Sequence, residues 1–139
     1  MLGGEPGGPS GLLLPPHVLE ADSNAVATAS EEVFGPVITV IPAAGEEDAL
    51  RIANDTEYGL SSAVFTRDVD RGTRFALRVE AGMTHVNDSP VNDDANTAFG
   101  GVKASGLGRE GGQHSIDFYT ESRIVHVAMG DTHVPRFGA

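Results

Sequence analysis

The sequence contains no cysteine, and basic residues are scarce among its 139 residues. Without cysteine, the chain cannot form a disulfide bond, bind zinc through thiolates or supply a thiol nucleophile. Nine basic residues against 20 acidic ones give a net charge of −11. This charge repels phosphate backbones and anionic lipid, and no cluster of Lys and Arg reverses it locally. We therefore expect no nucleic-acid partner.

Long hydrophobic runs are also missing from the sequence. No apolar stretch approaches the roughly 20 residues that a helix needs to cross a bilayer. The first residues lack the basic and apolar regions of a secretory signal peptide. We therefore expect no membrane partner, and a cytoplasmic location is the default.

The length fits one domain, since a chain of this size can bury roughly two-thirds of the surface that it exposes when unfolded. Glycine and proline are concentrated in residues 1–16, where they break any helix or central strand. Residues 1–30 are predicted to be a Gly/Pro-rich N-terminal loop with a short strand. Because termini of this composition are usually poorly ordered, this segment is interpreted as a truncated start.

The rest of the chain alternates between strand and helix patterns. Strands are predicted at Val37–Ile41, Leu60–Thr66, Met83–Asn87 and Arg123–Met129, the first of them buried. A first helix is predicted to begin at Glu46 and to end at Asn54 and Asp55. A second helix is capped by Thr66 or Asp68 and stopped by Gly82. A short third helix covers Gly112–Tyr119. This order predicts an α/β fold with a partial parallel sheet, crossover helices and a C-terminal edge strand.

The segment Glu31–Val37, EEVFGPV, carries the most chemical information. Gly35 can adopt backbone angles closed to other residues, and Pro36 fixes its own φ. In an extended segment, Glu32 and Phe34 would project to the same side, so that an acceptor and a ring could meet one ligand. A sugar diol beside a flat heterocycle would suit them. The alternative interpretation is an ordinary strand start with a solvated acid.

A long loop, residues 88–111, follows the third strand and is rich in Gly, Asn, Asp and Ser. Loops of this length are usually functional or disordered. Three of its glycines formally match a GxGxxG dinucleotide fingerprint: Gly106, Gly108 and Gly111. That fingerprint must follow a strand directly, whereas the preceding predicted strand ends at Asn87. Flexible loop glycine is the favoured interpretation.

Other polar residues indicate no separate chemistry. Ser89 and Ser105 have no adjacent base, and the five histidines lack HExxH spacing. The acidic residues near Asp93 do not follow the EF-hand pattern, so a solvated loop is favoured and no metal site is predicted. Lys103 and Arg109 are isolated cations, for which loop anchoring to a carboxylate is favoured over phosphate binding.

Four segments together resemble the aldehyde dehydrogenase superfamily. They occur in the family's order and at similar separations: EEVFGPV at 31–37, DTEYGLSSAVFTRD at 55–68, GMTHVND at 82–88 and AFGGVKASGLGRE at 98–110. The resemblance extends from about Leu12 to Val127, covers the C-terminal portion of the catalytic domain, and points toward bacterial members that act on aromatic aldehydes.

The resemblance implies NAD(P)-dependent oxidation of an aldehyde to a carboxylic acid through a thiohemiacetal. In the family, the residues corresponding to Glu32 and Phe34 hold the nicotinamide ribose and contact the nicotinamide. Phe99 corresponds to an aromatic residue that lines the aldehyde pocket. Further candidates for the pocket are Val91, Asn92 and Thr97. The resemblance implies NAD or NADP as the cofactor. The choice between the two is left open, because the residues that make it lie near the adenosine ribose, outside this chain.

This chain departs from the family in lacking its nucleophilic cysteine. The general-base glutamate and the cofactor domain also lie upstream of EEVFGPV in the family, so we expect no catalytic residue here and an inactive isolated chain. Residues 31–120 correspond to the C-terminal part of the catalytic domain, 121–129 to an oligomerisation strand and 130–139 to a variable tail. The resemblance implies a homo-oligomer for the full-length protein. The alternative is a non-catalytic truncated α/β module that associates with other subunits through its C-terminal edge strand.

Overall fold

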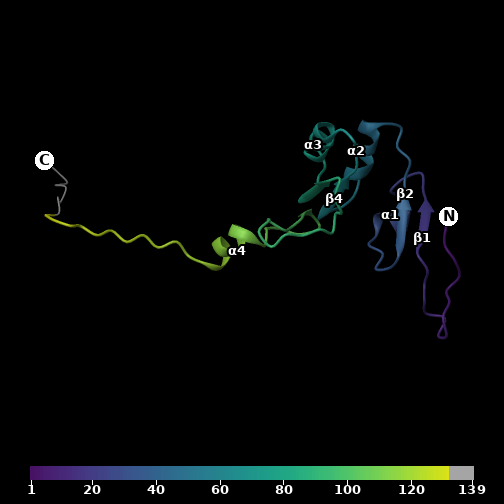
Figure 1. The fold of residues 1–139 in the computed structure, drawn as a ribbon, viewed down its shortest axis with the longest axis horizontal. Coiled ribbons are helices and arrows are strands. Elements are labelled where there is room, and N and C mark those ends of the chain that lie inside the picture. Colours follow the sequence, from purple (N-terminus) through teal and green to yellow (C-terminus); the bar gives the residue numbers. More distant parts are fainter. Residues whose placement is uncertain (132–139) are drawn as a thin grey trace.

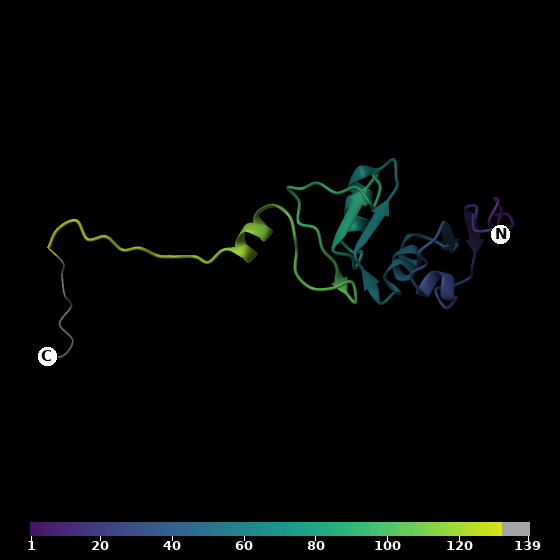
Figure 2. The same ribbon diagram turned by 90° about the horizontal axis from the view of Figure 1, so that it is seen from below.

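The computed structural model describes residues 1–131. Figure 1 shows an elongated chain, with β1, β2 and α1 near the N-terminus and α2, α3 and β4 in the middle. Helix α4 and an extended segment follow, leading away from the other elements (Figures 1 and 2). None of the helices in residues 1–131 has the length and apolar character required to span a membrane.

The N-terminal part contains a pair of parallel strands, β1 (His17–Glu20) and β2 (Val37–Val40), in which His17 pairs with Val37. Helix α1 (Ala27–Ser30) lies in the connection, and the carbonyl oxygen of Thr28 accepts a hydrogen bond from Thr39 Oγ1 at 2.9 Å. The strand predicted at Val37–Ile41 is confirmed at Val37–Val40, but its predicted burial is wrong. Only alternate residues of β2 are half-buried, and Ile38 is 63% exposed, because a two-stranded sheet leaves one face uncovered.

The middle part confirms the predicted crossover. Strand β4 (Ser61–Val64) pairs in parallel with β5 (Met83–Val86), and helix α3 (Val69–Ala76) connects them. Helix α2 (Glu46–Asn54) precedes β4. The structure therefore has the predicted α/β class, with parallel strand pairs and crossover helices, although the two parallel pairs belong to separate sheets.

The predicted start of α3 is confirmed, but its predicted end is wrong. Asp68 caps the helix, its carboxylate accepting a hydrogen bond from the backbone N–H of Arg71 at 2.9 Å. The helix ends at Ala76, before reaching Gly82. Gly82 is instead required by close packing, because a Cβ there would lie 1.8 Å from the carbonyl oxygen of Gly100.

The long loop contains short structure that the sequence did not predict. Strand β6 (Val102–Lys103) pairs antiparallel with β3 (Tyr58–Gly59), joining the loop to the segment before β4. Two-residue strands carry no periodicity, so only tertiary contacts reveal them. Helix α4 (Gly112–Tyr119) follows the loop, as predicted.

Residues 121–131 form no helix or strand within the described chain. The predicted strand Arg123–Met129 runs extended without pairing to another described segment, and Met129 is 94% exposed. Its role as an edge strand remains a prediction. Most of the tail predicted at 130–139 lies outside the described residues.

The core of this part of the chain is thin. Leu50 on α2, 7% exposed, is the only large apolar side chain that is buried among residues 1–131. Many large apolar side chains on α4 and in the C-terminal segment are exposed, including Ile116, Phe118 and Ile124. Most of the apolar surface of these elements is thus uncovered by residues 1–131.

Candidate functional site

A hollow of about 490 Å³ lies between the start of the EEVFGPV segment, β3 and the turn after β6. One wall consists of residues 29–32, which lead out of α1. The other consists of residues at β3, the start of β4 and the turn after β6. The lining residues are Ala29, Ser30, Glu31, Glu32, Tyr58, Leu60, Ser61, Ala104 and Ser105.

Glu32 lies in this hollow with an exposed side chain. Within residues 1–131 its carboxylate forms no hydrogen bond and no ion pair, so both oxygens are available as acceptors. An acceptor that is free in an open hollow can receive hydrogen bonds from the hydroxyl groups of a ligand. The hollow is therefore the candidate binding site of the chain.

The backbone beyond Glu32 turns tightly. The N–H of Gly35 donates to the carbonyl oxygen of Val33 at 2.7 Å, and the N–H of Val37 donates to that of Gly35 at 2.8 Å. These are three-residue turns, so the segment lacks the plain extended form that was expected. Gly35 also has no positive φ, and it uses no backbone conformation closed to other residues.

The two aromatic candidates lie outside the lining of this hollow. Phe34 is 94% exposed and Phe99 is 37% exposed. Phe99 is fixed by its backbone, which exchanges hydrogen bonds with Glu110 at 2.8 and 2.7 Å. The described chain thus places Glu32 in the site and leaves Phe34 and Phe99 on its surface, where their rings can contact a larger ligand or another segment.

The remaining pocket candidates contribute to the internal structure of the long loop. The amide of Asn92 donates to Asp88 at 2.6 Å, and Thr97 Oγ1 donates to the carbonyl oxygen of Asp94 at 2.8 Å. The pKa of Asp88 is lowered chiefly by the Asn92 hydrogen bond, then by the backbone N–H of Ser89. Within residues 1–131, no group of three or more acidic or His side chains is arranged so that it could hold a metal ion.

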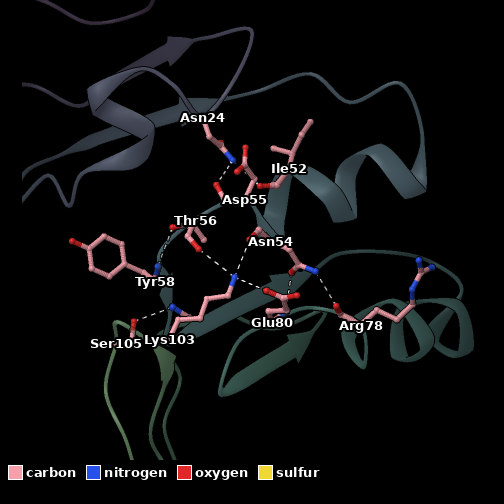
Figure 3. A network of polar contacts seen from close by, with 11 residues as sticks. Asn24, Ile52, Asn54, Asp55, Thr56, Tyr58, Arg78, Glu80, Lys103 and Ser105 are labelled. Atoms are coloured by element: carbon pink, nitrogen blue, oxygen red, sulfur yellow. Dashed lines mark hydrogen bonds and ion pairs between the residues drawn. The ribbon is translucent and has the colours of Figure 1, made fainter.

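The wall that faces Glu32 rests on a polar network centred on Lys103 (Figure 3). The Lys103 ammonium donates to the carbonyl oxygens of Asn54 and Thr56, at 2.8 and 3.2 Å. It also pairs with a carboxylate oxygen of Glu80 at 2.6 Å, which confirms the predicted anchoring to a carboxylate. Sequence reasoning did not find that this network supports the site.

Arg109, the second isolated cation, is also an anchor, but its predicted carboxylate partner is wrong. Its guanidinium donates to the carbonyl oxygens of Gly101 and Gly108, at 2.8 and 2.7 Å. The glycines of the loop leave backbone carbonyl groups within reach, and these accept the cation in place of an acid.

Sequence reasoning also missed Tyr58, Leu60 and Ser61 as residues that line the hollow. The only sequence feature that could have indicated them is the DTEYGLSS segment, which is one of the four segments that resemble the aldehyde dehydrogenase superfamily.

Comparison with known proteins identifies the family. The sequence model of the aldehyde dehydrogenase family matches residues 1–125. The chain belongs to the aldehyde dehydrogenase family. It is 42% identical over 129 residues to the vanillin dehydrogenase of Pseudomonas sp. strain HR199, covering 93% of this chain and 27% of that protein. It is 44% identical over 121 residues to the benzaldehyde dehydrogenase YfmT of Bacillus subtilis, covering 87% of this chain and 25% of the relative.

Solved structures agree with this assignment. The crystal structure of a Mycobacterium tuberculosis aldehyde dehydrogenase complexed with NAD+ superposes with a TM-score of 0.81 at 38% identity, covering 93% of this chain and 26% of that one. The chain spans about a quarter of the length of the curated relatives that it matches. The family therefore accounts for the fold of this chain, and about three-quarters of the length of each relative lies outside the matched part.

Proposed function

We propose that this chain provides the nicotinamide-ribose contact and one part of the aldehyde pocket of an NAD(P)-dependent aldehyde dehydrogenase. The observation that carries the proposal is the carboxylate of Glu32, which lies in an open hollow and has no hydrogen-bond or ion-pair partner among residues 1–131. A ribose diol needs an acceptor of this kind, and an ionised carboxylate forms the stronger, charge-assisted hydrogen bonds.

The residues present fit a nicotinamide nucleotide. Glu32 would accept from the two ribose hydroxyl groups, and the exposed ring of Phe34 would lie against the nicotinamide. The cofactor, when bound, supplies hydride acceptance from the aldehyde carbon. The contribution of this chain is to bind and orient the nicotinamide ribose, while the choice between NAD and NADP belongs to residues near the adenosine ribose.

Aromatic aldehydes are the substrate class that we propose. Support comes from the relatives, since one is named a vanillin dehydrogenase and another a benzaldehyde dehydrogenase. Phe99, which is partly exposed in the middle of the long loop, would supply an aromatic face to such a substrate.

The chain by itself is proposed to be catalytically inactive, because it contains no thiol to attack an aldehyde. We also propose that the full-length protein is a cytoplasmic homo-oligomer. Association through residues 121–129 is the second candidate function. It is favoured by the exposed apolar side chains of this segment, whose backbone pairs with no other segment of residues 1–131.

The proposal is tested by titrating the purified chain with nicotinamide mononucleotide, which carries the nicotinamide ribose without the adenosine half. Binding is followed by NMR shifts of backbone amides. Glu32→Gln should weaken binding by about tenfold, since it removes a charged acceptor. Glu31→Gln is the matched control, because Glu31 also lines the hollow and its loss removes the same charge. Equal binding by the wild-type chain and the Glu32 variant would overturn the proposal.

A further inference from the structure

Lys103 is the only lysine in the sequence, and its ammonium is fully occupied. An ammonium group has three N–H donors. The structure gives Lys103 three acceptors: the carbonyl oxygens of Asn54 and Thr56, and the carboxylate of Glu80. The side chain is 25% exposed, so the group is fixed by partners and is not a free surface charge.

The backbone of Lys103 is also unusual. Its φ is +55°, in the left-handed region that residues with a side chain rarely adopt. Such a conformation persists only when the surrounding contacts impose it. Here the contacts are the hydrogen bonds of the ammonium and the pairing of β6 with β3. The chain therefore retains a strained residue at the point where these contacts converge.

The partners of Lys103 all belong to segments that support the wall facing Glu32. Asn54 is the last residue of α2, and a cation near the final carbonyl groups of a helix is favourable. The side chain of Asn54 continues the network, accepting from the N–H of Glu80 at 2.9 Å and donating to the carbonyl oxygen of Arg78 at 3.1 Å. Lys103 thus ties the segment before β3 to the segment before β5 (Figure 3).

The residues after Lys103 complete the wall. The N–H of Ala104 donates to the carbonyl oxygen of Glu57 at 2.9 Å, and Ser105 Oγ accepts from the N–H of Gly59 at 3.0 Å. Ala104, Ser105 and Tyr58 all line the hollow that contains Glu32. Any movement of the turn after β6 would shift this wall relative to Glu32.

We infer that Lys103 is a positioning residue for the nicotinamide-ribose site, since its ammonium holds the wall formed by Tyr58, Ala104 and Ser105 at a fixed place opposite Glu32. The inference rests on the proposed function. It assigns the single lysine a role in ligand binding that involves no contact between its ammonium and the ligand.

The absence of cysteine allows a direct test. Lys103→Cys creates a unique thiol, and alkylation with 2-bromoethylamine restores an ammonium at nearly the original length. Alkylation with iodoacetamide gives a neutral adduct as the control. We expect the unmodified variant to bind nicotinamide mononucleotide about tenfold more weakly than wild type. The aminoethyl adduct should recover most of the affinity, and the neutral adduct should not.

A second control separates positioning from general stability. Arg71→Met removes the 2.6 Å ion pair between Arg71 and Glu46, which joins α2 to α3 but does not reach the hollow. It should leave the affinity unchanged.

Lys103→Gly is a second variant that removes the ammonium. Because glycine adopts a positive φ without strain, this variant can replace Lys103→Cys in the test if the cysteine variant folds poorly. It should weaken binding as the cysteine variant does.

Amide hydrogen exchange distinguishes this inference from the proposed function. Loss of the ammonium should accelerate exchange at Gly59 and Ala104, whose N–H groups bond across the wall, with little change in α3. Wild-type affinity in Lys103→Gly, or recovery by the neutral adduct, would overturn the positioning role. Unchanged exchange at Gly59 would overturn it even if Glu32→Gln weakened binding. Equal binding by wild type and Glu32→Gln would instead refute the proposed function. In that case, amide exchange at Gly59 and Ala104 would still show whether Lys103 holds the wall in place.

Discussion

Arg78, two residues after the end of α3, forms an ion pair through both of its terminal nitrogens with Glu47 in the first turn of α2. The Arg78 Nη1–Glu47 Oε1 distance is 2.7 Å and the Nη2–Oε2 distance is 2.5 Å. The Arg78 hydrogen bond lowers the pKa of Glu47 from its ordinary value of 4.5, and the same hydrogen bond raises the pKa of Arg78. Together with the Arg71–Glu46 ion pair, this pair links the first turn of α2 to α3 and the residues that follow it.

The first prediction concerns stability in acid. A carboxyl whose pKa is lower when folded stabilises the folded chain at pH values above its unfolded pKa, here 4.5. This contribution is lost as the pH falls through the lower, folded pKa. Stability should therefore decline below pH 4.5 as Glu47 takes up a proton. Thermal melts of the wild type across this range, compared with Glu47→Gln, measure the effect.

The Glu47→Gln variant should show a shallower acid dependence, since its amide does not titrate. The pKa values of Asp48 and Asp88 are also lowered, so some acid dependence should remain in the variant. Identical pH profiles for wild type and variant would show that the ion pair with Arg78 contributes nothing in solution, as holds for many exposed pairs.

The elements that the sequence predicted well are those with a local signal. Helix α3 shows this, because Asp68 marks its start with a side chain that caps the backbone. Its end had no comparable signal. Gly82 resembles a helix-terminating glycine, but its lack of a side chain serves contact with Gly100, which is 18 residues away in the sequence. Local patterns cannot separate these two uses of glycine.

The candidate site was predictable only in part for the same reason. Glu32 could be identified from its segment, and the structure places it in a hollow. The opposite wall depends on the pairing of Tyr58 with Lys103, which are separated by 45 residues and lie in two-residue strands. No periodicity marks such strands. The positions of Phe34 and Phe99 relative to a ligand likewise depend on contacts beyond their own segments.

The second prediction concerns the cap of α3. Asp68→Ala removes the acceptor for the N–H of Arg71 and should lower the free energy of unfolding by about 1 kcal/mol. Asp68→Asn keeps an acceptor oxygen and should lose much less. Asp70→Ala is the control, because Asp70 lies in the same first turn but does not cap it. Chemical denaturation of the three variants gives the comparison, and equal losses for the alanine variants would contradict the capping role.

The third prediction contrasts two glycines. At Gly82 an added Cβ would meet the backbone of Gly100 and Gly101, at 1.8 and 2.9 Å, and backbone atoms cannot move away cheaply. Gly82→Ala should therefore destabilise the chain by about 2 kcal/mol or more. At Gly35 the nearest atom would be Val33 Cγ1 at 3.9 Å, an ordinary contact. Gly35→Ala should change stability by less than about 0.5 kcal/mol.

Thermal and denaturant melts of both variants test this contrast. A large loss at Gly35 would mean that the EEVFGPV segment needs a glycine for its own folding. If Gly35→Ala changes stability as little as expected but weakens the binding of nicotinamide mononucleotide, the ligand approaches the backbone closely at Gly35.

The fourth prediction concerns association. The apolar side chains of residues 121–131 are exposed, and the backbone of this segment is unpaired within the described chain. Exposed apolar surface and a free strand edge both favour contact with another chain, so the isolated chain should self-associate. Val127→Lys should weaken this association by about tenfold or more, since it removes the burial of one valine. Sedimentation velocity at several concentrations measures the change.

Ser122→Lys separates apolar burial from charge in that experiment. It adds the same charge to the same segment but removes no apolar side chain. If burial of Val127 drives association, the serine variant should associate nearly as wild type does. Equal weakening by both variants would assign the effect to charge. A monodisperse wild-type monomer with a cooperative melt would refute association altogether, and would mean that the thin core around Leu50 suffices to keep the chain folded alone.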